Sequence, residues 1–401
     1  MKKYTLLFST LCLFGASGQS AAETRQDACA PVATWTSLQH PQGATLLAPA
    51  FMEKLSRRQV VLLGENHTSF EHHRWQLQTI AGLHTWRSDL VLGFEMFPRR
   101  TQAALDRWVA GKLSEAEFLE QTEWYKVWSY DPALYMPLFH FARMNRIPMV
   151  ALNVDRSFTS AVRKGGWDAV PESQREGVSR PAPASPGYRE ELTEVYRAHS
   201  KARTEADHDK TADATPDPDD AGFRRFSEGQ LTWDRAMAEA INSAVRQPGA
   251  PLVIGIMGAG HVMNRYGVPH QLADLGVHDV AVLLAWDAGQ ACDALTSTIA
   301  DAVFGIATPA VAANSDKPRL GVQLQDDKDG VRIAEVTPAS IAEDTGLRND
   351  DLLLEVAGVT VKAAAEVSKI IQRQAPGTWL PIKIRRGAHT LEVVAKFPAQ
   401  Q

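Results

Sequence analysis

The sequence contains little cysteine and no excess of positive charge. Its 401 residues include three cysteines, and 47 acidic side chains outnumber 42 lysines and arginines, so the formal net charge is −5. A protein that binds nucleic acid needs a basic surface to attract the phosphate groups. The charge balance therefore predicts that nucleic acid is not a partner.

Long apolar runs are also missing beyond the amino end. Met1-Lys2-Lys3 precede the apolar stretch Tyr4–Ala16, and the small residues Ala21-Ala22 follow, an arrangement typical of a secretory signal peptide. The stretch is shorter than the roughly 20 residues that a membrane-spanning helix needs. We expect residues 1–22 to be a signal peptide that directs export to the bacterial periplasm or envelope. Cys12 follows a poor lipoprotein signal, so a lipid anchor there is disfavoured.

Two cysteines, Cys29 and Cys292, remain after the predicted signal peptide. Disulfides persist in exported proteins, and a bond between these two would tie the amino-terminal arm to the end of the first domain. Two free thiols are the alternative, and the sequence leaves both open.

The chain is longer than one compact core usually allows, which predicts two domains. In the first, short apolar runs rich in Val, Ile and Leu are typical of buried strands. These runs are Val60–Leu63, Leu90–Phe94, Ile147–Leu152, Leu252–Met257 and Val280–Trp286. Helical patterns lie between them, at Phe70–Ile80, Thr101–Val109, Ser114–Gln121 and Glu228–Val245. Alternating strands and helices predict an α/β fold with a mostly parallel sheet flanked by helices and a helical insert.

Changes in composition suggest the domain boundaries. Proline recurs over Glu172–Gly187, and Thr204–Asp220 is acidic; both are expected to be surface excursions, the second disordered over about 200–222. We predict an α/β domain over 23–306, a linker over 307–318 and a small α+β domain over 319–401.

The last domain carries several motifs in a fixed order, namely Arg319–Val322, Val336–Ser340, Ala342–Leu353 and Val356–Val361. Together they resemble PDZ domains of bacterial envelope proteases. The resemblance places Leu320, Gly321 and Val322 in the loop that binds the carboxylate of a peptide or protein C-terminus, with the peptide added as a strand. Asn349-Asp350-Asp351 depart from the usual Gly-Asp pair, in a turn. The alternative is a PDZ domain that only packs against its own first domain.

Polar residues stand at the carboxyl ends of four predicted strands: Glu65 and His67, then Glu95, then Asn153, and finally His261. Ligands of open α/β sheets bind at those ends. The pattern therefore predicts one site built from all of these residues. The motif Gly-x-x-His occurs twice, with a glycine that allows close approach of the backbone.

Two chemistries suit this set of residues. His67 and His261 can ligate a divalent transition metal or haem iron, and Glu65 or Glu95 can complete the shell or act as a general base. A second cluster, between Trp124 and Phe141, is rich in aromatic residues that can stack on a flat macrocycle. Its members Trp128, Tyr130 and Tyr135 are the candidates for haem contact, and packing in the core is the alternative.

The first domain resembles the ChaN-like family of haem-binding envelope proteins, which shares a superfamily with the Tiki and TraB proteins and the erythromycin esterases. The residues that carry the resemblance are Leu62–His67, Phe94–Phe97, Ala151–Asn153 and Met257–His261. It implies haem bound between the sheet edge and a smaller helical portion, in a pocket that a homodimer can share, with a tyrosine on the iron. Tyr135 is the residue carried over, with Tyr125 or Tyr130 as replacements.

The leading hypothesis is a periplasmic haem- or iron-binding protein whose PDZ module docks a partner's C-terminus. The Tiki branch implies the alternative, a metal-dependent hydrolase in which His67, His261 and Glu95 hold Zn or Mn and Glu65 is the base. A third hypothesis is a PDZ scaffold without activity. The same residues support the first two, and the sequence does not choose between them.

Overall fold

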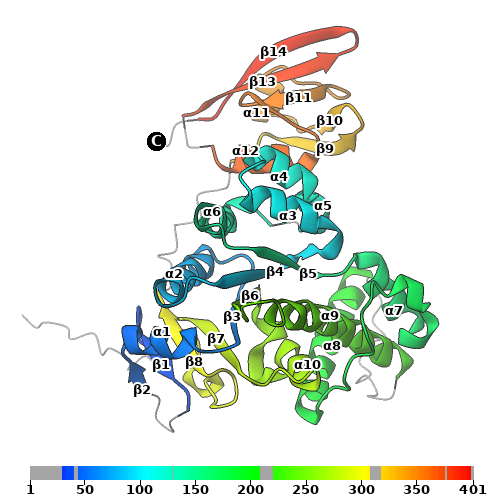
Figure 1. Cartoon of the computed structure of the whole chain (residues 1–401). Helices are drawn as coiled ribbons and strands as arrows, with labels where there is room; N and C mark the ends of the chain where they lie inside the picture. The colour runs from blue at the N-terminus through cyan, green and yellow to red at the C-terminus, as the bar shows by residue number, and fades with distance from the viewer. Residues whose placement is uncertain are drawn as a thin grey trace, which may run out of the picture.

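A computed structural model of the chain describes residues 29–39, 44–128, 130–207, 220–307, 318–374 and 377–398 (Figure 1). These residues form an eight-stranded, mostly parallel sheet with helices and a separate six-stranded antiparallel sheet. The predicted fold class is thereby confirmed. The predicted signal peptide, most of the predicted linker and residues 208–219 of the acidic excursion lie outside the described residues.

The five predicted strands all belong to the large sheet, whose order is β2-β1-β8-β7-β3-β6-β4-β5. They are β3 (Val60–Glu65), β4 (Leu90–Pro98), β5 (Met149–Asn153), β6 (Leu252–Gly258) and β7 (Val280–Asp287). Three strands were not predicted: β1 (Trp35–Ser37), β2 (Ala44–Leu46) and β8 (Ala302–Ile306). From β8 to β5 the strands are parallel, and β1 pairs antiparallel with β2 and β8.

Helices cover both faces of this sheet, which explains why its strands are continuous apolar runs. On one face Val61 and Leu63 of β3 share a core with Trp75 of α2 (Phe70–Trp86). On the other face Leu62 packs in a core with Ile241 of α9 (Ala221–Val245). Helix α1 (Ala48–Ser56) joins the first layer, and α10 (Val268–Asp274) joins the second (Figure 1).

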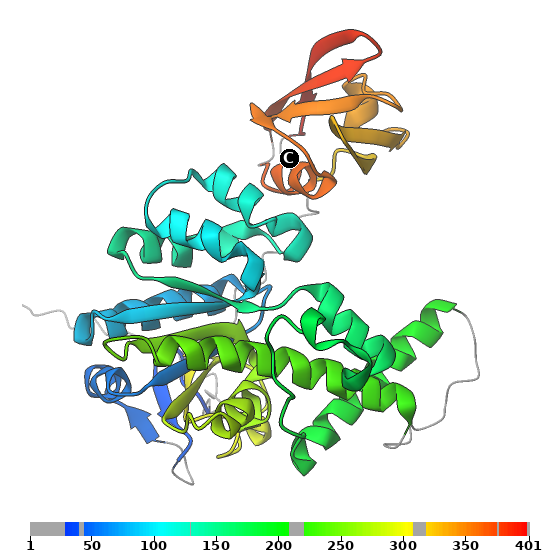
Figure 2. The same cartoon turned by 45° about the vertical axis from the view of Figure 1, so that its right-hand side comes forward.

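A small helical insert stands between β4 and β5, at the edge of the sheet (Figure 2). It comprises α3 (Gln102–Val109), α4 (Glu115–Gln121), α5 (Trp124–Val127), the 3-10 turn η2 (Pro132–Leu134) and α6 (Met136–Asn145). The predicted capping box begins α4, because the Ser114 hydroxyl accepts from the Glu117 amide and the Glu117 carboxylate accepts from the Ser114 amide. Trp108, Phe118 and Phe139 of the insert are fully buried, and they extend the core on the face of the sheet that α2 covers.

A second helical region follows β5. It comprises α7 (Arg156–Gly165), the 3-10 turns η3 (Trp167–Ala169) and η4 (Glu172–Gln174), α8 (Pro186–Asp207) and α9. The proline-rich segment is packed rather than free: Val178 and Ala182 are buried, and the side chain of Gln271 exchanges two hydrogen bonds with the backbone of Ala182. Helix α8 runs to Asp207 and α9 begins at Ala221, so α8 enters the start of the acidic stretch and α9 begins directly after its end.

The PDZ domain forms the second sheet, in the order β14-β13-β11-β10-β9, with β12 paired to β11. Its elements are β9 (Val322–Asp327), β10 (Gly330–Val336), α11 (Ile341–Asp344), β11 (Leu352–Val356), β12 (Val359–Thr360), α12 (Ala364–Gln372), β13 (Trp379–Arg386) and β14 (His389–Lys396). Strand β9 is an edge strand, so one row of its backbone groups is available to another strand. Gly321 has φ +85°, and a Cβ there would lie 2.2 Å from Cβ of Ser340, so only glycine fits.

The departure from the usual PDZ pattern lies in the turn before β11. Asp350 has φ +68°, a conformation that glycine adopts most easily. Its neighbour Asp351 is buried and accepts hydrogen bonds from the Arg348 amide and the Arg386 guanidinium, at 2.6 to 2.8 Å. Asp351 thus closes this turn, and its contacts do not include Leu320, Gly321 or Val322.

Cys29 and Cys292 form a disulfide, with Cα atoms 5.6 Å apart. The bond joins the arm before β1 to the 3-10 turn η7 (Cys292–Ala294), close to β8. Of the two alternatives left by the sequence, the structure has the disulfide. Within the described part of the chain, no helix combines the length and apolarity that a membrane crossing requires.

Candidate functional site

The polar residues at the strand ends lie together, because β3, β6, β4 and β5 are consecutive in the sheet although not in the sequence. Nε2 of His261 is 3.4 Å from Oε1 of Glu95. The Asn153 amide donates to the backbone carbonyl of Glu95 over 3.0 Å. A Cβ on Gly258 would lie 3.1 Å from Nε2 of His67, so that ring stands directly over the end of β6. The residues thus share one rim of the sheet.

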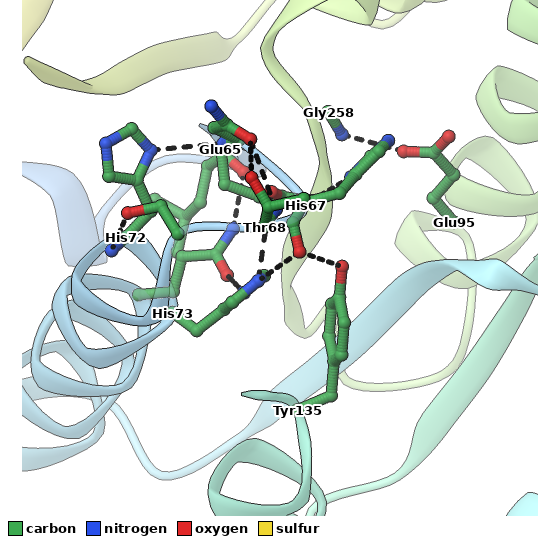
Figure 3. Close-up of polar contacts among 12 residues, drawn as sticks. Glu65, His67, Thr68, His72, His73, Glu95, Tyr135 and Gly258 are labelled. Carbon is green, nitrogen blue, oxygen red and sulfur yellow. Dashed lines mark hydrogen bonds and ion pairs between the residues drawn. The ribbon is translucent and has the colours of Figure 1, made fainter. Parts of the chain in front are cut away.

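His67 occupies the turn between β3 and α2, where Glu65 holds it (Figure 3). Its Nδ1 lies 2.6 Å from Oε1 of Glu65. Burial lowers the pKa of His67, but the hydrogen bond to Glu65 and the charge of Glu95 outweigh burial and raise it above the ordinary value. Because Glu65 engages Nδ1, Nε2 is the nitrogen that can meet a ligand.

His261 follows β6 and is held in the same manner by a residue that the sequence did not indicate. Its Nδ1 lies 2.6 Å from Oδ1 of Asp234 in α9, and the Tyr188 hydroxyl donates to Oδ2 of Asp234 over 2.7 Å. Burial lowers the pKa of His261, but the Glu95 charge and the hydrogen bond to Asp234 raise it to about 10. The site therefore contains two carboxylate-held histidines.

One signal in the sequence could have revealed Asp234. It stands three, four and seven positions before the buried residues Met237, Ala238 and Ile241, on the face of α9 that packs on the sheet. A carboxylate in such an apolar stripe requires a partner. Tyr188 carries no comparable signal, because only the tertiary fold brings α8, in which it lies, to Asp234.

Glu95 lies between the two histidines and is 1% exposed. Burial alone would raise its pKa, but His261, His67 and the Gly258 amide, which donates to Oε2 over 2.7 Å, lower it below the ordinary value (Figure 3). Oε1 of Glu95 and Oε2 of Glu65 accept no hydrogen bond from the described residues. Their nearest donors among the described residues are Nε2 of His261, 3.4 Å from Oε1 of Glu95, and Nε2 of His73, 3.9 Å from Oε2 of Glu65. Both oxygens therefore retain capacity to accept from a bound cation or proton donor.

Both glycines of the Gly-x-x-His motifs are required by close packing. A Cβ on Gly64 would lie 2.5 Å from a methyl group of Leu284 and 2.7 Å from one of Val262. A Cβ on Gly258 would lie 2.8 Å from Cε1 of His67. Gly64 thus leaves room for the turn after β6 at the end of β3. Gly258 leaves room for the His67 ring at the end of β6.

Aromatic side chains of the insert surround His67. The Trp128 and Tyr130 rings lie 4.8 and 5.2 Å from the imidazole, centre to centre. Tyr135 lies deeper and is fully buried; its hydroxyl donates to the His67 carbonyl over 3.4 Å, and its ring lies 4.2 Å from His73. Burial raises the pKa of Tyr135. A ligand that approaches His67 therefore meets Trp128 and Tyr130 before Tyr135.

Two histidines at the start of α2, His72 and His73, support the turn that carries His67. Nδ1 of His72 accepts from the Asn66 amide over 3.1 Å, and its Nε2 is 3.0 Å from Asp287. His73 contacts the Gln76 side chain and the His67 carbonyl. Both rings are buried and their nitrogens are already hydrogen-bonded. They therefore position the turn of His67 and are not free to bind a ligand beside it.

Two observations bear on the kind of ligand that the site can bind. Among the described residues, no three His, Cys, Asp or Glu side chains are arranged to hold a metal ion. Two cavities, of about 460 and 320 Å3, lie beside α1 and do not touch the site. The donors therefore form pairs and not a closed metal shell.

Partly buried apolar side chains follow the predicted peptide loop. Leu320 is buried, whereas Val322 and Leu324 of β9 and Ile370 of α12 are partly buried and each packs against the PDZ core. Because β9 and α12 are in contact, these side chains form an apolar strip. The free edge of β9 lies beside this strip, as binding of an added strand requires.

The fold and site define a two-domain protein, in which an α/β domain with carboxylate-held histidines at its strand ends is joined to a PDZ domain. The family described as "Haem-binding uptake, Tiki superfamily, ChaN" matches residues 51–272, and the PDZ family matches residues 318–396. Because the first match spans more than half of the chain, this protein belongs to the ChaN haem-binding uptake family of the Tiki superfamily.

Solved structures resemble each part. The ChaN protein of Campylobacter jejuni, described with cofacial heme binding, is 18% identical with a TM-score of 0.50, covering 67% of this chain and 95% of its own. The HtrA3 PDZ domain with the phage-derived ligand FGRWV is 20% identical (TM-score 0.19), covering 20% of this chain and 84% of its own. A Yersinia pestis serine endoprotease is 19% identical (TM-score 0.19), covering 21% and 30%. No curated protein matches the sequence significantly.

Proposed function

We propose that this protein binds haem at the rim formed by His67, Trp128 and Tyr130, and that its PDZ domain docks the C-terminus of a peptide or protein. One observation carries the haem proposal: the His67 imidazole is held at Nδ1 by Glu65 and flanked by two aromatic rings. A carboxylate on one nitrogen orients the other toward iron and increases its basicity. Aromatic rings give a macrocycle apolar surfaces to stack on.

The family supports haem as the ligand, since its description names haem binding. Tyr130 is the tyrosine that we propose for contact with the macrocycle or the iron, because Tyr135 is fully buried. Asn153 and His261 would then not touch the haem. They would position Glu95, which both of them contact. The proposal includes a homodimer in which two chains share the pocket. A doubling of the mass of the protein in solution on addition of hemin would support it.

We place the protein in the periplasm or the bacterial envelope. The charged and then apolar amino end supports export. The Cys29–Cys292 disulfide supports an oxidising compartment, where such bonds persist.

The haem proposal is tested by adding hemin to the purified chain and recording the Soret band. We expect a shifted band for the unaltered chain and a weaker shift for His67→Ala. His278→Ala is the matched control, because His278 is exposed and lies at the other end of the strands, before β7. A free-hemin spectrum for the unaltered chain would remove the proposal.

The alternative, a metal-dependent hydrolase using His67, His261 and Glu95 with Glu65 as the base, is less well supported because the donors form pairs. Elemental analysis of the same sample separates the two. Stoichiometric Zn or Mn, lost in His261→Ala and present without haem, would favour the hydrolase.

Peptide docking is tested with a fluorescent pentapeptide that ends in valine, because the strip beside β9 is apolar. The same peptide with a C-terminal amide is the control, since the loop amides would recognise a carboxylate. Equal affinity for the two peptides would contradict C-terminal recognition.

A further inference from the structure

Helix α12 of the PDZ domain lies against the helical insert of the first domain, near α4 and α5 (Figures 1 and 2). Three charged residues, Glu366, Lys369 and Arg373, follow one another at intervals of three and four residues, so they share one side of α12. Lys362, just before the helix, continues the row. The helix therefore presents a charged side to the insert.

Specific contacts join this side to the insert. Nζ of Lys369 donates to the Tyr130 carbonyl over 2.8 Å and lies 4.5 Å from the centre of the Tyr125 ring. The Arg373 guanidinium contacts the Asp131 carboxylate at 2.5 Å, and Lys362 contacts Glu120 at 2.5 Å. Burial lowers the pKa of Lys369 to about 8, which reflects how far this contact excludes water. Cations of one domain thus meet carbonyl, aromatic and carboxylate groups of the other.

The contacted segment is the one that covers His67. The Tyr130 ring packs on the His67 ring, and its carbonyl also accepts from the Trp124 indole over 2.9 Å. Asp131 caps the turn η2 by accepting from the Ala133 amide over 2.9 Å. That turn leads directly into Tyr135, whose hydroxyl contacts the His67 carbonyl. Tyr130 and Asp131 therefore form a wall of the ligand site beside His67, and Lys369 and Arg373 hold this wall in place.

The opposite side of α12 faces the PDZ domain and its peptide strip. Val367 and Ile371 are buried in the PDZ core, and Ile370 packs at its edge together with Val322 and Leu324 of β9. The Ala364 amide donates to the Asp326 side chain at the end of β9 over 2.7 Å. A strand added to β9 would contact α12.

We infer that α12 couples the two sites: a peptide C-terminus beside β9 and a ligand at His67 change each other's affinity through the contacts of Lys369 and Arg373 with Tyr130 and Asp131. The inference rests on the proposed function. Helix α12 is in contact with β9 on one side and with Tyr130 and Asp131 on the other, and linkage requires that the effect of each ligand on the other is reciprocal. Lys369 and Arg373 are positioning residues, since they touch the wall and not the ligand.

The experiment measures hemin affinity of the full chain with and without the valine-terminated pentapeptide, and peptide affinity with and without hemin. We expect each ligand to change the affinity of the other by the same factor, about fivefold or more. The amidated peptide should have no effect. In the double variant K369M/R373M the factor should fall to about one, with both ligands still bound.

A matched control is the double variant K383M/R385M. Lys383 and Arg385 form ion pairs with Glu355 and Asp329, at 2.8 and 3.0 Å, inside the PDZ sheet. This pair removes the same number of charges from the same domain without touching the insert, so the coupling should persist. Loss of coupling in the control as well would overturn the assignment to Lys369 and Arg373.

Hydrogen exchange separates failure of the inference from failure of the haem proposal. Peptide alone should change exchange in the segment from Trp124 to Tyr135 in the unaltered chain and not in K369M/R373M, whether or not hemin binds. If hemin binds but peptide alters neither hemin affinity nor this exchange, the inference is wrong. If the pentapeptide does not bind, the docking proposal is wrong and the coupling inference that rests on it falls as well.

Discussion

Asp234 and His261 lie 2.6 Å apart, although 27 positions separate them in the chain. The carboxylate is fully buried and also accepts from Tyr188. Because a buried carboxylate is costly without its partners, this pair determines both the orientation of His261 and part of the stability of the domain.

Asp234→Ala should lower the free energy of unfolding by about 3 to 5 kcal/mol, because it leaves His261 and Tyr188 buried without their partner. Urea unfolding of the full chain measures the loss. Asp279→Ala is the control: its ion pair with Arg58 is partly exposed, and its removal should cost less than about 1 kcal/mol. Equal losses in the two variants would contradict a special role for Asp234.

Stability should depend on pH through His261. Its pKa in the folded protein is about 10, above the ordinary value of 6.5, so the folded state binds a proton more tightly than the unfolded state. This contribution is fully present below pH 6.5 and is lost as pH rises toward 10. Unfolding at pH 6.5, 8 and 9.5 should show falling stability, and the slope should decrease in His261→Phe. An unchanged slope in that variant would assign the effect to other groups.

The disulfide should stabilise the first domain. It closes a loop of 263 positions, and removal of a native disulfide typically costs about 2 to 5 kcal/mol. The double variant C29S/C292S should therefore melt at a lower temperature than the oxidised chain by calorimetry. Reduction of the unaltered chain should lower the melting temperature equally, and should leave the double variant unchanged. A double variant as stable as the oxidised chain would show that the bond contributes nothing.

Ala357→Gly should stabilise the PDZ domain. Ala357 has φ +54° and precedes Gly358, with φ +74°, in the turn between β11 and β12. Alanine in this conformation costs about 1 kcal/mol, which glycine avoids. Native-state hydrogen exchange of β11 and β13 should become slower. Ala365→Gly, at an exposed position in α12, should instead destabilise the PDZ domain and make this exchange faster. If both variants changed the exchange rate in the same direction, the argument from backbone conformation would be refuted.

The sequence predicted those elements whose local pattern reflects their surroundings. Strand β3 was recognisable because both of its faces are buried, so that Val60 to Leu63 form an uninterrupted apolar run. Strands β1, β2 and β8 were missed, since β1 and β2 have three residues each and the place of β1 and β8 depends on long-range pairing, such as Trp35 with Phe304. Short strands carry too little periodicity to be recognised alone.

The residues of the site were predicted unequally for a similar reason. His261 follows β6, and Glu95 follows Phe94, the last residue of β4 that pairs with β6, although β4 itself continues to Pro98. Both stand after strong apolar runs, and parallel strands bring their carboxyl ends to one edge. Asp234 and Tyr188 come from helices, whose partners depend on how α8 and α9 pack on the sheet. The contact of Lys369 with Tyr130 could not be predicted, because it joins two domains across 239 positions.

The sequence by itself determined the two domains, the strands of the parallel core and the polar residues at their ends, because burial and turns impose local patterns on the chain. Only the tertiary structure decided which carboxylate holds which histidine, that the cysteines are joined, and that α12 lies against the wall of His67. The strand order, in which β3 neighbours β6 and β7 rather than β4, likewise decides which strand ends lie side by side. Such an order arises from packing over long separations and leaves no local pattern.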